Sequence, residues 1–156
     1  KPLGVHVLAS GDRDAIHWFL EDKIDTRSSN YLEDAATEIQ VQGLELDYTC
    51  LLWDADMRYE KGKWGFYSFN GNTKWIKQEG NTESNQEKIK YMLNAYRVLL
   101  TRARVGMVIC VPKGNPNKTK DGLFFEDPTR RPDYYDGTYE YLKSLGLKII
   151  DESTDK

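Results

Sequence analysis

The sequence NAYRVLLTRARVGMVICV, residues 94–111, joins the end of a helical pattern to a long apolar run. Apolar side chains recur at helical spacing over residues 84–104, and Ser84 is a candidate N-cap. Residues 105–111 are almost continuously apolar, which is typical of a strand buried on both faces of a parallel sheet, and Pro112 ends this run. The stretch therefore predicts a helix that leads directly into a buried strand.

The pattern continues on both sides of this stretch. The other expected elements are a strand at 4–9, a helix at 12–23, an extended segment at 37–41, a buried strand at 48–53, a helix at 138–145 and a last strand at 147–150. Apolar strands separated by helices imply an α/β fold with a mainly parallel sheet and helices on both faces. The chain is long enough for one domain, residues 1–156, and shows no internal repeat.

Two segments interrupt this alternation. Residues 60–80 predict a β-hairpin insertion, because aromatic residues flank Asn70-Gly71, a strong type I′ turn signal. The aromatic residues of this insertion either form a small core or stack on unpaired bases. Residues 113–133 predict a polar loop, whose basic residues are either solvated or in contact with phosphate.

The composition limits the classes of function. The net charge of −3 argues against tight, non-specific binding of nucleic acid by the whole surface. Cys50 and Cys110 lie in apolar runs and are expected to be buried thiols of a cytoplasmic protein, and a disulfide between neighbouring strands is the alternative. His6 and His17 are isolated and no metal-ligand spacing occurs, so we expect no metal site. We expect no membrane segment, and the chain, which does not begin with methionine, is expected to be part of a longer polypeptide.

The segment QGLELD, residues 42–47, places a glycine where an extended stretch has to turn before the next strand. Gly43 permits a positive φ and lets a ligand approach the backbone. Glu45 points away from its two leucine neighbours, so its carboxylate is held on a fixed surface. Since ligands bind at strand ends in parallel α/β sheets, the segment is a candidate ligand loop, and a β-turn with a solvated glutamate is the alternative.

Arg97, Arg102 and Arg104 lie in a mainly apolar helical pattern just before a predicted buried strand. Guanidinium groups so close to a core have to reach a helix end, a carboxylate or an anion. Arginine suits phosphate because its planar fork donates two hydrogen bonds at once. The alternative is that the three side chains extend to solvent or complement the C-terminus of the helix.

The two segments together resemble motifs of superfamily 1 helicases. QGLELDY, residues 42–48, is similar to motif V, which has the pattern Gly-Leu-Glu-Phe followed by a strand. LLTRAR, residues 99–104, is similar to motif VI, which has the pattern Val-x-x-Thr-Arg-Ala. The flanking residues resemble the DUF2075 family, bacterial helicase-like proteins related to the Schlafen helicase domain. The resemblance covers residues 37–54 and 91–111.

This resemblance implies the second RecA-like domain of a P-loop NTPase-type helicase, which hydrolyses ATP with Mg²⁺ in a cleft shared with an N-terminal RecA-like domain. Arg102 matches the arginine finger, the catalytic residue that stabilises charge on the transferring phosphoryl group. Glu45 matches the residue that contacts the ribose, and Gly43 matches the backbone near the γ-phosphate. The remaining implied positions are Gln42, Arg97 and Arg104 for the nucleotide, and Thr37, Gln40 and Thr101 for single-stranded DNA or RNA.

The chain also departs from the helicase pattern. Ile39 and Gln40 replace the usual histidine and small hydroxyl residue before the glycine, and the sequence contains no Gly-x-x-x-x-Gly-Lys-Ser/Thr loop. It contains no acidic magnesium-binding motif either, if Asp54 and Asp56 are taken as the polar end of a strand. We therefore expect the chain alone to be monomeric, to bind no cofactor and to lack ATPase activity. The alternatives are a non-catalytic RecA-like module that docks a protein or nucleic acid, and an unrelated flavodoxin-like domain.

Overall fold

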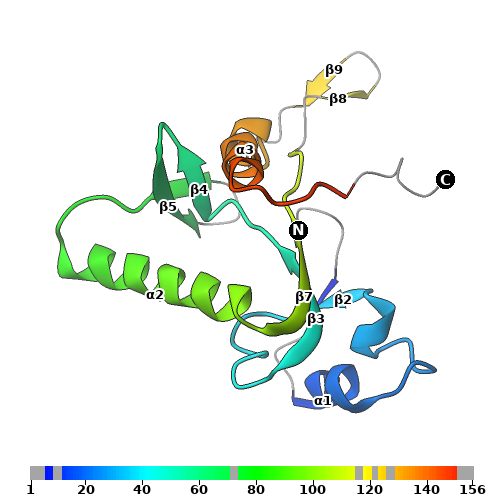
Figure 1. Ribbon diagram of the computed structural model, residues 1–156. Coiled ribbons are helices and arrows are strands. Elements are labelled where there is room, and N and C mark those ends of the chain that lie inside the picture. Colours follow the sequence, from blue (N-terminus) through cyan, green and yellow to red (C-terminus); the bar gives the residue numbers. More distant parts are fainter. Residues whose placement is uncertain are drawn as a thin grey trace. The chain divides into compact units, whose positions relative to one another are not determined.

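The computed structural model describes residues 6–8, 12–70, 74–114, 118–120, 123–125 and 129–150. It is a mixed α/β structure with parallel and antiparallel sheets (Figure 1). The contacts divide the chain into two compact units. Unit 1 comprises residues 1–51 and 93–108, and unit 2 comprises residues 52–92 and 109–156. No helix of the described ranges is long and apolar enough to cross a membrane.

The first part of unit 1 is a small parallel βαβ arrangement. Its elements are β1 (His6–Val7), α1 (Asp12–Leu20), the 3-10 helix η1 (Ser29–Tyr31) and β2 (Asp34–Ala35). β1 pairs in parallel with β2, and the Leu8 amide extends the pairing by donating to the Ala35 carbonyl at 3.0 Å. The Trp18 indole N–H donates to the Asp34 carbonyl at 3.1 Å, which holds α1 against β2.

A second pair of strands follows the predicted helix-to-strand stretch. β3 (Leu46–Leu52) pairs with β7 (Ala103–Cys110), which follows α2 (Glu83–Leu100). The Leu46 amide donates to the Arg102 carbonyl at 3.1 Å and the Trp53 amide donates to the Cys110 carbonyl at 2.9 Å, so the pair is parallel. The helix and its strand are confirmed, but the helix ends at Leu100. Arg102 and Arg104 therefore lie outside it, and Ser84 lies in its first turn, one residue inside its start at Glu83.

The expected burial of these strands is wrong. Tyr48 on β3 is 74% exposed and Val105 on β7 is 64% exposed. Cys50 is exposed and Cys110 is half-buried, so neither is the fully buried thiol that the sequence suggested. The physical reason is that each strand pairs with one neighbour among the described residues, and a two-stranded sheet covers far less surface than the larger sheet that the pattern implied.

Two other expected extended segments are not strands. Residues 37–41 belong to a turn in which the Val41 amide donates to the Thr37 carbonyl at 3.1 Å. A local side-chain bond favours this turn, because the Thr37 amide and hydroxyl both donate to the Gln40 amide oxygen, at 2.9 and 3.1 Å. Residues 147–150 have no strand pairing. Of the described sheets, β1–β2 and β3–β7 are parallel and β4–β5–β6 and β8–β9 are antiparallel, so the expectation of a mainly parallel sheet is wrong.

Unit 2 contains a three-stranded antiparallel sheet of β4 (Met57–Glu60), β5 (Lys63–Asn70) and β6 (Lys74–Lys77). The expected hairpin is confirmed, with Asn70 opposite Lys74, and its predicted turn residue Gly71 lies outside the described residues. β4 was not expected. Lys61 and Gly62 join it to β5 with φ values of 51° and 79°, and two positive φ values are what a type I′ turn requires.

The core of unit 2 lies where this sheet meets α3 (Asp136–Ser144). Gly137 brings the helix so close to β4 that a Cβ atom there would lie 2.1 Å from the Tyr59 carbonyl oxygen. The buried Thr138 hydroxyl accepts from the Tyr59 amide at 3.0 Å, and Tyr59 stacks on Tyr141 with ring centroids 4.0 Å apart. Residues 113–133, the predicted polar loop, contain β8 (Lys118–Lys120), β9 (Leu123–Phe125) and the start of the 3-10 helix η2 (Pro132–Tyr134).

Candidate functional site

The two helicase-like segments meet in unit 1 through Arg102. This half-buried residue lies in the short connection between α2 and β7. Its Nε donates to the Val98 carbonyl at 3.2 Å, and its Nη1 donates to the Leu44 carbonyl. The guanidinium therefore ties the last turn of α2 to the loop that contains Gly43 and Glu45. A guanidinium suits this position because one planar group can donate to two carbonyls in different directions.

Charged side chains gather beside this contact. Arg104, at the start of β7, places Nη1 4.0 Å from Glu45 Oε2 and Nε 3.6 Å from Asp47 Oδ1. All three side chains are more than 60% exposed, so water and salt weaken both ion pairs. Arg102 therefore contacts the residue next to Glu45 in unit 1, whereas the ion pair with Glu45 is made by Arg104.

The edge on which these residues lie is the amino end of β3 and β7. Ligands in open parallel sheets usually bind at the carboxyl ends of the strands. The expectation that residues 42–47 bind a ligand because they lie at a strand end therefore does not apply to this edge. Its candidacy depends on the chemistry of the converging arginine and carboxylate side chains.

Gly43 has the backbone conformation that the sequence suggested. Its φ is +86°, which L-amino acids with side chains rarely adopt. A Cβ atom built at this glycine would have no neighbour within 4 Å, so the glycine is required by the backbone conformation and not by close packing. Gln42 beside it is exposed.

The other predicted positions make local contacts. Arg97 is exposed on α2, and its Nη1 donates to Asn94 Oδ1 at 3.2 Å. The Thr101 hydroxyl lies 2.8 Å from the Arg97 carbonyl and 3.2 Å from the Val98 carbonyl, and it donates within the last turn of α2. Thr37 and Gln40 bond to one another in the turn before Gly43. These residues shape the two segments, and Arg102 and Arg104 connect them.

Comparison with known protein families shows to which family the chain belongs. Residues 4–113 match the family described as Schlafen group 3, DNA/RNA helicase domain. The chain belongs to this family. The match spans both converging segments and the β4–β6 sheet and ends before α3, so the Schlafen group 3 region covers most of the chain. No curated protein and no solved structure matches it.

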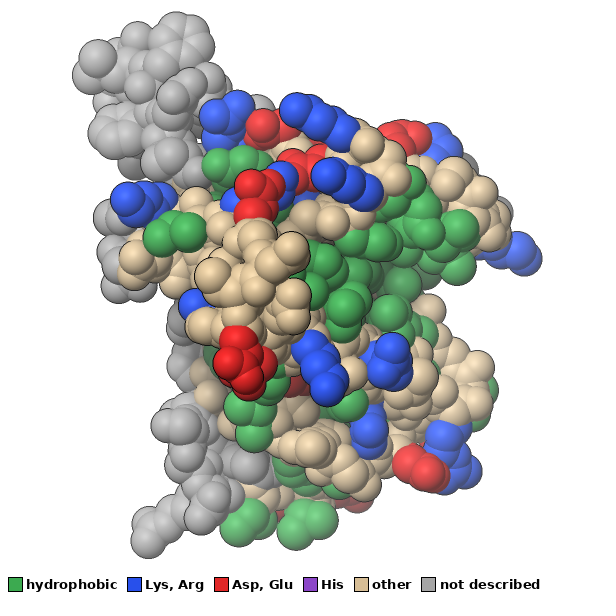
Figure 2. Space-filling model, turned by 90° about the vertical axis from the view of Figure 1, so that its left-hand side faces the viewer, with side chains coloured by type: hydrophobic (Ala, Val, Ile, Leu, Met, Phe, Trp, Pro, Cys, Tyr) green, Lys and Arg blue, Asp and Glu red, His purple; other side chains and the backbone are tan. Residues whose placement is uncertain are grey.

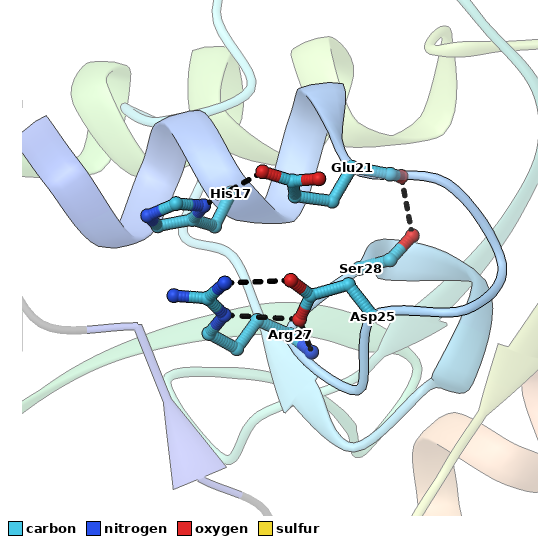
Figure 3. A network of polar contacts seen from close by, with 5 residues as sticks. All are labelled: His17, Glu21, Asp25, Arg27 and Ser28. Atoms are coloured by element: carbon cyan, nitrogen blue, oxygen red, sulfur yellow. Dashed lines mark hydrogen bonds and ion pairs between the residues drawn. The ribbon is translucent and has the colours of Figure 1, made fainter.

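A polar network at the end of α1 was missed in the sequence (Figure 3). His17 Nδ1 lies 3.0 Å from Glu21 Oε1, so His17 is not isolated, and ligand atoms of His17, Glu21 and Asp25 lie within 4.8 Å of one another. Arg27 occupies both Asp25 oxygens, with contacts of 2.9 and 2.6 Å, and holds the pKa of that carboxyl well below its usual range. This guanidinium would repel a cation, so the network is better explained as a structural one. It fastens the loop to the end of α1 through the Ser28 hydroxyl, which donates to the Glu21 carbonyl at 2.8 Å.

A buried arginine in unit 2 was also missed. Arg58 on β4 is only 4% exposed, and its Nε donates to the Ala55 carbonyl at 2.6 Å. Its guanidinium carbon lies 3.5 Å from the ring centroid of Tyr134, 3.9 Å from that of Tyr67 and 5.2 Å from that of Trp75. Burial lowers the pKa of Arg58, while the aromatic faces partly compensate for lost hydration. Since these rings come from distant parts of the chain, no local sequence pattern reveals the arrangement.

Proposed function

We propose that this chain is the second RecA-like domain of an ATP-dependent DNA/RNA helicase or translocase of superfamily 1 and the DUF2075 type. Membership of the Schlafen group 3 helicase-domain family supports the helicase role. The contact of Arg102 with the Leu44 carbonyl supports the pairing of motif V with motif VI, because it joins the two segments at one edge. In this proposal the N-terminal RecA-like domain of the same polypeptide supplies the phosphate-binding loop and the groups that hold Mg²⁺.

The proposed roles follow from the contacts at this edge. Arg102 acts as the arginine finger by exchanging its carbonyl partners for phosphate oxygens, which are stronger acceptors because they are charged. Glu45 contacts the ribose, and its exposed ion pair with Arg104 is weak enough to be replaced. Gly43 lies near the γ-phosphate. Gln42, Arg97 and Arg104 add nucleotide contacts, and Thr37, Gln40 and Thr101 contact single-stranded DNA or RNA.

The experiment is to substitute Arg102 in the helicase polypeptide that contains this domain, and to measure ATP turnover and nucleotide binding separately. Arg102→Lys keeps one positive charge and Arg102→Ala removes it. Both are expected to lower turnover about 10³-fold or more while nucleotide affinity changes little. Arg131→Ala is the control, because Arg131 is an exposed arginine of unit 2 that pairs with Asp133. Unchanged turnover in the Arg102→Lys variant removes Arg102 from the mechanism.

A second candidate function is a non-catalytic RecA-like module that docks a protein or nucleic acid. One observation favours it: Nε and Nη1 of Arg102 already donate to backbone carbonyls, as they would in a purely structural role. In that case Arg102→Lys lowers the melting temperature and has no effect on turnover. The two measurements together therefore distinguish the two functions.

A further inference from the structure

A shallow groove in unit 2 runs between the β5–β6 hairpin and the first half of α2. Its volume is about 570 Å³, within the range of roughly 300–1,000 Å³ that is common for ligand sites. Figure 2 shows hydrophobic side chains exposed among acidic and basic ones on the side of the molecule where β5 and the start of α2 lie in Figure 1. No residue of the proposed nucleotide edge lines this groove.

The apolar part of the lining is largely aromatic. Tyr67, Phe69, Trp75 and Tyr91 all contribute to it. Phe69 is 45% exposed and Tyr91 is 56% exposed, and Phe69 lies against Trp75 with ring centroids 4.8 Å apart. Aromatic faces carry partial negative charge and attract cations, and Arg and Lys are the side chains most often found over them.

The charged part of the lining has the same preference. Three carboxylates, those of Asp54, Asp56 and Glu87, border the groove together with a single ammonium group, that of Lys88. Counting also the buried guanidinium of Arg58, which lies over Tyr67 and Trp75, the carboxylates exceed the cations by one charge, which favours a cationic ligand over a phosphate backbone. The aromatic and acidic parts of the lining therefore point independently to a positively charged partner group.

The sheet that forms one wall already accommodates a guanidinium from its own chain. Arg58 stacks on Tyr67 and lies near Trp75, so these rings tolerate a cation in van der Waals contact. Because the charge of Arg58 opposes a second cation on the same two rings, Phe69 and Tyr91 are the better positions for a ligand. They are also the more exposed rings of the lining.

We propose that this groove binds an arginine or lysine side chain presented by a basic segment of a protein partner. The cation lies against the exposed faces of Phe69 and Tyr91, within the field of Asp54, Asp56 and Glu87. This interaction is additional to the proposed helicase function and does not depend on it, because it uses none of the nucleotide-edge residues.

The test uses the 156-residue chain and fluorescence anisotropy with labelled oligo-arginine, oligo-glutamate and single-stranded oligothymidylate probes. Tyr91→Leu keeps an apolar side chain but removes the aromatic face, and Glu87→Gln removes one carboxylate. Each is expected to weaken oligo-arginine binding about two- to fivefold. Glu83→Gln is the matched control, because it makes the same charge change on the same exposed helix outside the groove.

The result expected is oligo-arginine binding that falls with added salt, is weakened by both groove variants and is unchanged in the control. Circular dichroism shows whether each variant is folded. The side chains of Glu87 and Tyr91 are both exposed, so their substitution should leave the fold intact. Equal affinity of the groove variants and the unsubstituted chain overturns the proposal. So does preferential binding of oligothymidylate that is lost in Tyr91→Leu, since the groove then stacks bases.

Discussion

Gly137→Ala tests the packing of unit 2, because alanine normally stabilises an exposed helix position by about 1 kcal/mol relative to glycine. Here the new Cβ would lie 2.1 Å from the Tyr59 carbonyl oxygen, whereas such contacts are essentially never closer than 3.0 Å, so α3 and β4 have to separate by about 0.9 Å. Overpacking of this kind costs about 1–3 kcal/mol.

The separation also threatens neighbouring contacts. The Thr138 hydroxyl that accepts from the Tyr59 amide is buried, and loss of this hydrogen bond adds about 1–3 kcal/mol. After the gain in helix propensity, we expect Gly137→Ala to lower the free energy of unfolding by about 1–5 kcal/mol. Urea unfolding followed by far-ultraviolet circular dichroism measures it, with Glu140→Ala on the exposed side of α3 as the control. A variant as stable as the unsubstituted chain would refute the close approach of α3 to β4.

Two further predictions concern backbone conformation and ionisation. Gly43→Ala should lower the free energy of unfolding by about 1–2 kcal/mol, because φ is +86° and no space is lacking, and Gly43→Asn should cost less; thermal unfolding of both variants compares them. Burial and the hydrogen bond to Glu60 raise the pKa of Tyr67 from 10.0 to about 12, so its contribution to stability is complete below pH 10 and is lost as the pH rises from 10 to 12. Glu60→Gln should lower that pKa in an ultraviolet difference titration against Tyr67→Phe, and an unchanged titration would contradict the assigned cause.

Local signals predicted the helix-to-strand stretch but not the residue at which the helix ends. The apolar spacing extends to Ala103, so the pattern placed Arg102 in the helix. In the structure α2 ends at Leu100, and the Thr101 hydroxyl donates back into its last turn. A side chain that competes for backbone carbonyls can end a helix before its periodic pattern ends. This one difference moves Arg102 to a position from which it reaches Leu44.

The two turns of the antiparallel sheet differ in how clearly the sequence signals them. Asn70-Gly71 is a strong turn signal and predicts the β5–β6 hairpin correctly. Lys61-Gly62 also has the positive φ values of a type I′ turn, but lysine is not a usual first residue of such turns, so the sequence does not indicate it. The composition of residues 37–41 predicts an extended segment. The segment forms a turn instead, because the Thr37 amide donates to the Gln40 side-chain oxygen. Short-range polar contacts thus overrode propensity in this segment.

Burial and the groove could not be predicted from the sequence. Apolar runs such as residues 105–111 show that strands form, but their exposure depends on how many neighbours pair with them. The surroundings of Arg58 join residues from β4, β5, β6 and η2, and the groove joins a hairpin to a helix. At the candidate site, the sequence identifies the arginines and carboxylates, but the partner of each guanidinium depends on the path of the backbone.

The distribution of the four tryptophans gives each unit its own optical signal. Trp18 is the only one in unit 1, whereas Trp53 and Trp64 of unit 2 are nearly parallel with ring centroids 5.7 Å apart. Indoles held this close couple their strong electronic transitions and contribute an exciton signal to the far-ultraviolet circular dichroism. Loss of that signal reports the melting of unit 2 alone, and the part of the tryptophan emission that disappears in Trp18→Phe reports unit 1, so their comparison shows whether the two units melt together or one after the other.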